Sequence, residues 1–272
     1  MGKDNAPLER LIGREAEMQR LHKALHERQS QLIWGATDAG KSSLIDQALS
    51  ELPAAERRKC IGWTGPTSRR QFVEHLIREL YRAGDPFVQK KLRADRAEEG
   101  TLIRWIREQS ALRLRGVLFT AIEQSQYRFF MDHLLPVSHT LARLMKEIVC
   151  RTKTPIYLAG NGYSQAEIGN AWSLYWTDEY RIHLGPLPEA PARRLLENCI
   201  RRFHLGSLDL TGFREEVLHL SGHLPGAVVR MCELAADPHY HYRDQVKVKL
   251  IHVDYLMHGN GFSSTSFAGP TP

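Results

Sequence analysis

The chain has few of the residues that build disulfide frameworks or membrane spans. It contains four cysteines in 272 residues, far apart and without a C-x-x-C pair, so we expect reduced thiols rather than disulfides or a zinc site. No apolar run reaches about 18 residues, which argues against a transmembrane helix. The polar segment 1–10 lacks the apolar core of a secretory signal. These absences predict a cytoplasmic protein that does not contact membranes.

Long blocks of like charge are also missing. Hydrophobic residues make up 42% and charged residues 25% of the chain, as in ordinary globular proteins. The net charge of +6 permits contact with duplex DNA, but acids are interspersed among the basic residues. The short basic clusters, at 57–59, 69–70, 113–115, 193–194 and 201–202, are therefore interpreted as solvated helix faces or strand ends, with DNA contact as the alternative.

The most informative stretch reads Gly35-Ala36-Thr37-Asp38-Ala39-Gly40-Lys41-Ser42, followed by Ser43. Its G-x-x-x-x-G-K-S spacing comes after an apolar run at 32–34 and before a helical pattern at 43–52. Strand, glycine loop and helix form the context that a phosphate-binding loop requires. The alternative is a chance match in a glycine turn, and the two flanking elements argue against it.

The residue types of this loop indicate what it binds. Glycines let the backbone curl so that successive N–H groups point at a phosphate chain, and the helix start adds the positive end of its dipole. Lys41 is placed to reach the β- and γ-phosphates, and the Ser42 hydroxyl is placed to bind Mg²⁺. We therefore expect residues 35–43 to bind ATP or ADP together with Mg²⁺.

Strands and helices are expected to alternate through the first two thirds of the chain. Apolar runs predict strands at 32–34, 59–64, 117–122, 155–159 and 180–184, which together indicate a parallel sheet flanked by helices. Thr67 or Ser68 is expected to cap the helix that follows the second strand. Residues 85–100 are charged and weakly patterned, which favours a surface excursion.

The periodicity becomes purely helical from 189 to 236. Residues 246–255 fit either a closing strand pair or a turn of helix. The predicted fold class is α/β: a P-loop parallel sheet flanked by helices, followed by a small all-α lid. We expect a nucleotide-binding domain at 1–187, a helical lid at 188–258 and a disordered tail at 259–272.

These parts together resemble the AAA+ and related STAND ATPases, particularly the origin-recognition-like branch, over residues 11–236. Residues 11–15 (Leu-Ile-Gly-Arg-Glu) are similar to a family motif that lies over the adenine, and residues 35–42 are similar to its Walker A loop. Residues 185–188 are similar to the junction into the helical lid. Residues 222–230 look like the sensor-2 segment, so the resemblance implies that Arg230 contacts the γ-phosphate.

One part of the sequence departs from the family pattern. In the family a central strand ends in an Asp that orders Mg²⁺, and a nearby acid positions the attacking water. With that strand placed at 117–122, Thr120 stands where the Asp belongs and Glu123 keeps the second acidic position. Because a hydroxyl carries no charge, this alignment predicts a degenerate Walker B motif and weak or absent hydrolysis. In the alternative register Glu123 alone serves the metal.

Two further side chains are candidates because of their positions beside strands. Asn161 follows the fourth strand, where a sensor-1 residue would contact the γ-phosphate or position water; it is equally an ordinary turn residue. Arg181 is either an arginine finger for a neighbouring subunit or a surface arginine. The catalytic candidates are therefore Glu123, Asn161 and Arg230.

Two accounts of the function remain open. In the first, the protein is a nucleotide-dependent switch or assembly ATPase that acts on a protein partner or on copies of itself. In the second, it is a DNA-associated ATPase of the loader or transposition-regulator type, which would bind duplex DNA through phosphates. A small-molecule hydrolase or kinase is less favoured, because nothing in the sequence marks a substrate pocket.

Overall fold

The computed structural model describes residues 11–64, 68–94, 102–134, 137–162 and 164–258. These residues fall into two compact units. The sheet unit comprises residues 20–34 and 48–182, and the loop–lid unit comprises residues 11–19, 35–47 and 183–258. The phosphate loop thus belongs to the same compact unit as the C-terminal helices. The tail expected at 259–272 lies outside the described residues.

A five-stranded parallel sheet has the strand order β2-β3-β4-β1-β5. The strands are β1 (Gln31–Gly35), β2 (Cys60–Thr64), β3 (Arg128–Leu134), β4 (Ile156–Asn161) and β5 (Arg181–Leu184). Strands β2 and β3 run in register from the pair Cys60 and Arg128 to the pair Thr64 and Asp132. The fold class and four of the expected strands, at 32–34, 59–64, 155–159 and 180–184, are confirmed.

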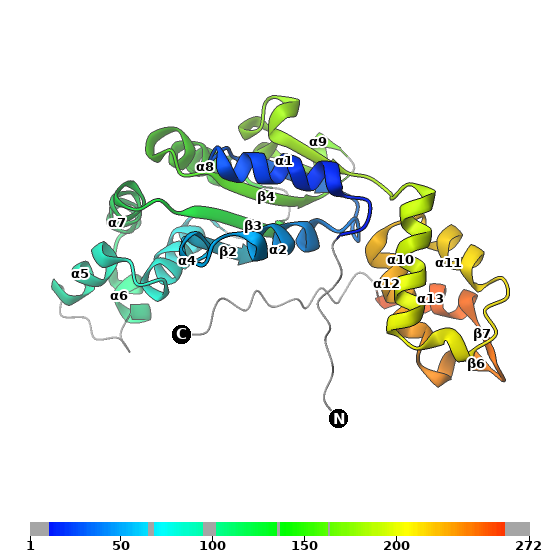
Figure 1. Ribbon diagram of the computed structural model, residues 1–272. Coiled ribbons are helices and arrows are strands. Elements are labelled where there is room, and N and C mark those ends of the chain that lie inside the picture. Colours follow the sequence, from blue (N-terminus) through cyan, green and yellow to red (C-terminus); the bar gives the residue numbers. More distant parts are fainter. Residues whose placement is uncertain (1–10, 65–67, 95–101, 135–136, 163, 259–272) are drawn as a thin grey trace. The chain divides into compact units, whose positions relative to one another are not determined.

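Helices fill the connections between these strands, as Figure 1 shows. They are α1 (Glu15–His26), α2 (Lys41–Glu51), α3 (Ala54–Arg57), α4 (Arg69–Arg82), α5 (Pro86–Ala94), α6 (Leu102–Glu108), α7 (Ala111–Gln124), α8 (His139–Thr152) and α9 (Gln165–Ile168). Helices α4, α5 and α7 pack on one another, and α4 also contacts β2. The apolar core of the sheet unit lies among these helices and the strands.

The strand predicted at 117–122 is wrong, because these residues belong to helix α7. The helix starts at Ser110, whose hydroxyl accepts a hydrogen bond from the Arg113 N–H. Its buried side chains lie on several faces because α4, α5 and α8 all pack against it: Leu114, Val117, Leu118, Phe119, Ala121 and Ile122. A short apolar run does not distinguish a strand from a buried stretch of helix.

The strand that the sequence did not predict is β3. Only three consecutive apolar residues, Phe129 to Met131, mark it, because Arg128 and Asp132 flank them. Both charged side chains are nevertheless buried. The guanidinium of Arg128 forms an ion pair with Glu56 at 2.9 Å and donates to the Leu25 carbonyl at 3.4 Å. An internal partner thus lets an arginine occupy a strand position that is ordinarily apolar.

The surface excursion expected at 85–100 is also wrong over Pro86–Ala94, which form α5. Val88 and Leu92 of this helix are buried in the core. Asp85 caps the helix, since its Oδ1 accepts from the Val88 N–H at 2.9 Å and its Oδ2 accepts from the Tyr127 hydroxyl at 3.1 Å. Residues 95–101 lie outside the described part of the chain.

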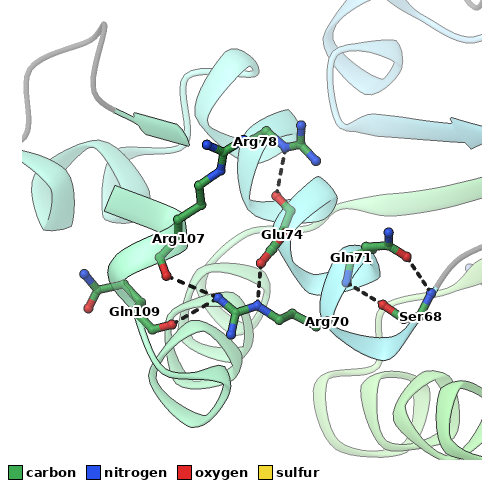
Figure 2. Close-up of polar contacts among 7 residues, drawn as sticks. All are labelled: Ser68, Arg70, Gln71, Glu74, Arg78, Arg107 and Gln109. Carbon is green, nitrogen blue, oxygen red and sulfur yellow. Dashed lines mark hydrogen bonds and ion pairs between the residues drawn. The ribbon is translucent and has the colours of Figure 1, made fainter. Parts of the chain in front are cut away.

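Helix α4 begins with a capping box, shown in Figure 2. The Ser68 hydroxyl accepts from the Gln71 N–H at 3.2 Å, and the Gln71 side chain accepts from the Ser68 N–H at 2.9 Å. Ser68 is therefore the cap; Thr67 lies outside the described residues. Figure 2 also shows that Arg70 pairs with Glu74 at 2.7 Å and donates to the carbonyls of Arg107 and Gln109 at 3.4 Å.

The C-terminal part of the loop–lid unit is helical, as predicted for 189–236. Its helices are α10 (Glu189–Arg202), α11 (Phe213–Ser221), α12 (Pro225–Ala235) and α13 (Val248–His258). They share an apolar core of their own, in which α12 packs against the other three. Residues 246–255 fall mainly in α13, after a short hairpin of β6 (His241–Tyr242) and β7 (Gln245–Val246). No described helix is long and apolar enough to cross a membrane.

Candidate nucleotide-binding site

The loop at 35–42 has the backbone conformation of a tight glycine loop that ends in a helix. Asp38 and Gly40 have positive φ angles of 65° and 90°. The Ala39 N–H donates to the Ala36 carbonyl at 3.2 Å, which closes a turn. Helix α2 starts at Lys41, so the loop runs directly into a helix N-terminus. Positive φ angles within a tight loop turn neighbouring N–H groups toward one concave face, a cradle that can hold an anion.

Gly35, where β1 ends and the loop begins, has no room for a side chain. A Cβ atom built on it would lie 2.2 Å from the Leu184 carbonyl oxygen, well inside van der Waals contact. Leu184 is the last residue of β5, so β5 backs the loop closely. Any larger residue at 35 would push the start of the cradle away from this strand.

Lys41 is buried with its ammonium against the backbone of the loop. Its side chain is 6% exposed, and Nζ donates to the carbonyls of Gly35 at 3.1 Å and Ala36 at 2.5 Å. These bonds hold a cation beside the N–H groups of the cradle and fix the direction of the lysine stem. A cation in this position adds its charge to the helix dipole in favouring a bound phosphate.

The motif at 11–15 lies against the same loop. The buried guanidinium of Arg14 donates to the Ala39 carbonyl at 3.3 Å and also to the Gly185 carbonyl. The same guanidinium forms an ion pair with Glu17 at 3.2 Å. Arg14 therefore connects the loop to the junction that precedes the lid helices. This role was not apparent from the sequence, where the motif was only a resemblance.

The lid helices contact the loop at Asp38. The Gly226 N–H, in the first turn of α12, donates to the Asp38 carbonyl at 2.8 Å, and the Tyr255 hydroxyl of α13 donates to Asp38 Oδ2 at 2.6 Å. A Cβ on Gly226 would approach the Asp38 Cβ to 2.7 Å. Nothing in the sequence pattern indicated Tyr255, because the two residues are 217 positions apart.

Asp132 lies at the carboxyl end of β3, in an irregular part of the sheet. Met131 pairs with Leu158 of β4 and Leu134 pairs with Gly160, so three steps on β3 face two on β4. Such a bulge re-aims side chains and is common beside active sites. Asp132 is 3% exposed. It lies at the same edge of the parallel sheet from which the loop leaves β1 and at which β4 ends in Asn161.

Glu123 does not occupy the position expected for it. It lies near the end of α7 and pairs with Arg151 of α8 at 2.9 Å. Thr120 lies one turn earlier, and its hydroxyl donates to the Gly116 carbonyl of its own helix at 3.0 Å. The alignment that gave these residues metal and water roles depended on a strand at 117–122. Since that strand is a helix, the acid near the end of a strand in this part of the sheet is Asp132 of β3.

The other candidate side chains, Asn161, Arg230 and Arg181, lie on the elements expected from the sequence, and the two arginines form ion pairs. Asn161 ends β4 and is exposed. Arg230 lies on α12 after the Pro-Gly turn and pairs with Glu233 at 2.6 Å. Arg181 stacks on the Trp172 ring, with its guanidinium carbon 4.1 Å from the ring centroid, and pairs with Asp178. Its side chain is therefore held within the sheet unit.

No protein-family model matches the chain, and no curated protein matches its sequence. Solved structures do match. A Walker-type ATPase of Pyrococcus abyssi matches with a TM-score of 0.57 and 19% identity, over 94% of this chain and 77% of that one. A STAND protein with a tetratricopeptide-repeat sensor from Pyrococcus horikoshii matches with a TM-score of 0.52 and 17% identity, over 93% of this chain but 33% of that one.

The Orc1 protein of Aeropyrum pernix, solved in complex with DNA, matches with a TM-score of 0.52 and 16% identity, over 94% of this chain and 68% of that one. At these identities the likeness is one of fold. It agrees with the parallel sheet flanked by helices and with the helical C-terminal region described above. The chain therefore has the P-loop NTPase fold.

Proposed function

We propose that this protein binds ATP and ADP at residues 35–43 and works as a nucleotide-dependent switch. The observation that carries the proposal is the loop itself: a backbone cradle that runs into the start of α2, with the Lys41 ammonium fixed on the carbonyls of Gly35 and Ala36. Backbone N–H groups, a helix N-terminus and one lysine are the donor set that a polyphosphate requires. The buried Nε of Arg14, which has no hydrogen-bond partner among the described residues, adds a donor for a ligand beside the loop.

Mg²⁺ fits the same proposal. The Ser42 hydroxyl, one residue after Lys41 in the first turn of α2, is the oxygen ligand that the loop supplies. Mg²⁺ prefers oxygen ligands and keeps several waters, so one protein hydroxyl together with the nucleotide's phosphates is a sufficient set of direct ligands. When bound, the metal neutralises charge on the β- and γ-phosphates.

We propose that hydrolysis is slow. Asp132, near the end of β3, is the candidate for the metal acid. The residues that follow it in the chain are His133 and Leu134, so the sequence places no second acid directly after it to position the attacking water. A switch depends on nucleotide binding more than on turnover.

The contacts of Asp38 indicate how the nucleotide state would reach the lid. Gly226 and Tyr255, from α12 and α13, both bond to this one loop residue. A phosphate that reshapes the loop therefore changes the positions available to both helices. Arg230, in the second turn of α12, is the proposed contact to the γ-phosphate, for which it would leave Glu233. A protein partner or another copy of the chain would then read the lid position.

The test is a titration of the full chain with ATP and ADP, with and without Mg²⁺, in which binding and turnover are followed together. Lys41→Ala should weaken ATP binding about 100-fold. The ammonium would lose two charge-assisted hydrogen bonds to the phosphates, which together are worth roughly 3 kcal/mol. The matched control is Lys59→Ala, which removes an exposed lysine next to β2 and should change nothing. If Lys41→Ala keeps the wild-type affinity, the loop is not the nucleotide site.

Duplex DNA is a second candidate ligand, because a structural neighbour was solved with DNA and the net charge is +6. The arginine clusters give it limited support. Arg70 is occupied by Glu74 and two carbonyls (Figure 2), and Arg193 pairs with Glu189. Phosphate-driven binding would weaken steeply between about 50 and about 300 mM salt. Equal duplex binding at both concentrations would exclude this candidate.

A further inference from the structure

A cavity of about 610 Å³ opens in the sheet unit, away from the residues discussed so far. Its lining comes from segments that precede strands: Ser30 before β1, Pro155 before β4, and Tyr180 before β5. The cavity is therefore at the amino ends of the strands, whereas the phosphate loop leaves the carboxyl end of β1. Its volume is within the range of small-molecule pockets.

The charge of this cavity is of one sign. Arg28, Lys146 and Lys153 line it, and none of its lining residues is an acid. The side chains of Lys146 and Lys153 form no ion pair or hydrogen bond with any residue in the described part of the chain, whereas the side chain of Lys23, on α1, pairs with Glu27. Two ammonium groups and a guanidinium around one hollow favour an anionic ligand.

Arg28 is held rigidly at the wall. It has a positive φ of 54°, and its guanidinium donates to the carbonyls of Gln126 at 3.3 Å and Tyr127 at 3.0 Å. Carbonyl partners fix its position without neutralising its charge. Burial, and then the nearby Arg128, lower the pKa of Arg28. A bound anion would relieve this electrostatic strain.

One wall carries aromatic and apolar surface. Trp176 lines the cavity and is 73% exposed, unlike the other four tryptophans, which are buried or half-buried. Its ring centroid is 6.4 Å from that of Tyr180. Val149, Pro155 and Leu174 complete the apolar lining. The exposed indole of Trp176 can stack on an aromatic ring of a ligand, and the basic residues beside it can bind a negatively charged group attached to that ring.

We propose that this cavity binds a nucleoside phosphate unit, with its base stacked on Trp176 and its phosphate between Lys146, Lys153 and Arg28. The ligand has two sources with the same chemistry, a free nucleotide or one unit of a single-stranded nucleic acid. A duplex does not fit, because its bases are stacked inside the helix and do not reach a single indole. The site is separate from the phosphate loop, so the proposal does not depend on the proposed function.

The first experiment measures binding of a fluorescein-labelled oligothymidylate of about 12 nucleotides to the full chain. Trp176→Ala should weaken binding about tenfold, since stacking on an aromatic side chain contributes on this scale. Lys146→Ala and Lys153→Ala should each reduce the slope of log K against log salt by about 0.7. The controls are Leu112→Ala, which removes an apolar side chain that is 75% exposed, and Lys249→Ala, which removes an exposed lysine of α13.

The second experiment locates the ligand. Cys150 also lines the cavity and is the exposed cysteine. Cys199 and Cys232 are buried, and burial raises the pKa of the Cys60 thiol to about 11, so Cys150 should be alkylated first. A ligand in the cavity should slow this alkylation, and should do so equally in Lys41→Ala.

Thymidine monophosphate distinguishes the two sources. Protection of Cys150 by the monophosphate identifies a free nucleotide, and protection by the oligonucleotide alone identifies a single strand; either result supports the proposal. The proposal is overturned if neither ligand binds, if duplex DNA or vesicles of anionic lipid protect Cys150 as well as the single strand does, or if Trp176→Ala behaves like Leu112→Ala. All variants are compared after their melting temperatures have been measured.

Discussion

Replacing Asp132 with Asn tests whether this acid, near the end of β3, serves the metal in place of Glu123, the acid that the apolar pattern indicated. The substitution keeps the size of the side chain and removes one negative charge at a position that is 3% exposed, inside the bulge of β3. If Asp132 orders the waters of a bound Mg²⁺, its loss should cost 10- to 100-fold in Mg²⁺ affinity or turnover, or about 1.4–2.8 kcal/mol. ATP binding without Mg²⁺ should be nearly unchanged.

The assay is a Mg²⁺ titration of nucleotide binding and hydrolysis, with the melting temperature measured in parallel because Asp132 has other contacts in the fold. Glu123→Gln is the matched control, since it removes an exposed carboxylate that pairs with Arg151, and it should leave the Mg²⁺ dependence as it is. Thr120→Asp should gain no turnover. The reasoning is refuted if Glu123→Gln shifts the Mg²⁺ dependence and Asp132→Asn, folded normally, does not.

Three further substitutions test the surroundings of the loop and the sheet. Gly226→Ala should weaken ATP binding and destabilise the protein by about 1–3 kcal/mol, because the new Cβ would lie 2.7 Å from that of Asp38; calorimetry and thermal melts measure both effects. Arg14→Ala should lower the free energy of unfolding by about 3 kcal/mol through the loss of charged hydrogen bonds to two carbonyls, and an unchanged urea midpoint would contradict this. Burial lowers the pKa of His75, so the unfolded chain binds the proton more readily; stability should fall as the pH drops below about 6.5, and the stability of His75→Phe should be flatter over that range in urea titrations.

The sequence predicted the parts of the site that are local in the chain. The loop at 35–42 and the start of α2 follow from a short pattern with a fixed spacing, and the end of β4 near Asn161 follows from a local apolar run. Four of the five strands of the sheet were predicted at the correct places. These features depend on residues within a few positions of one another, so the pattern alone was sufficient.

What the sequence did not predict depends on contacts between distant residues. Helix α7 buries apolar side chains on several faces because α4, α5 and α8 pack against it. Residues 117–122 therefore form a nearly continuous apolar run, without a clear helical spacing of apolar and polar positions. Strand β3 was missed because the buried charges of Arg128 and Asp132 make it look polar. Only the fold shows that Glu56 pairs with Arg128. The metal and water roles expected of Thr120 and Glu123 depended on the misplaced strand.

The hydrogen bond between Asp38 and Tyr255 also has an evolutionary consequence. If either residue changed alone, this hydrogen bond beside the loop would be lost. Proteins that share this arrangement should therefore either keep both side chains or replace both, and the two positions should covary although 217 residues separate them.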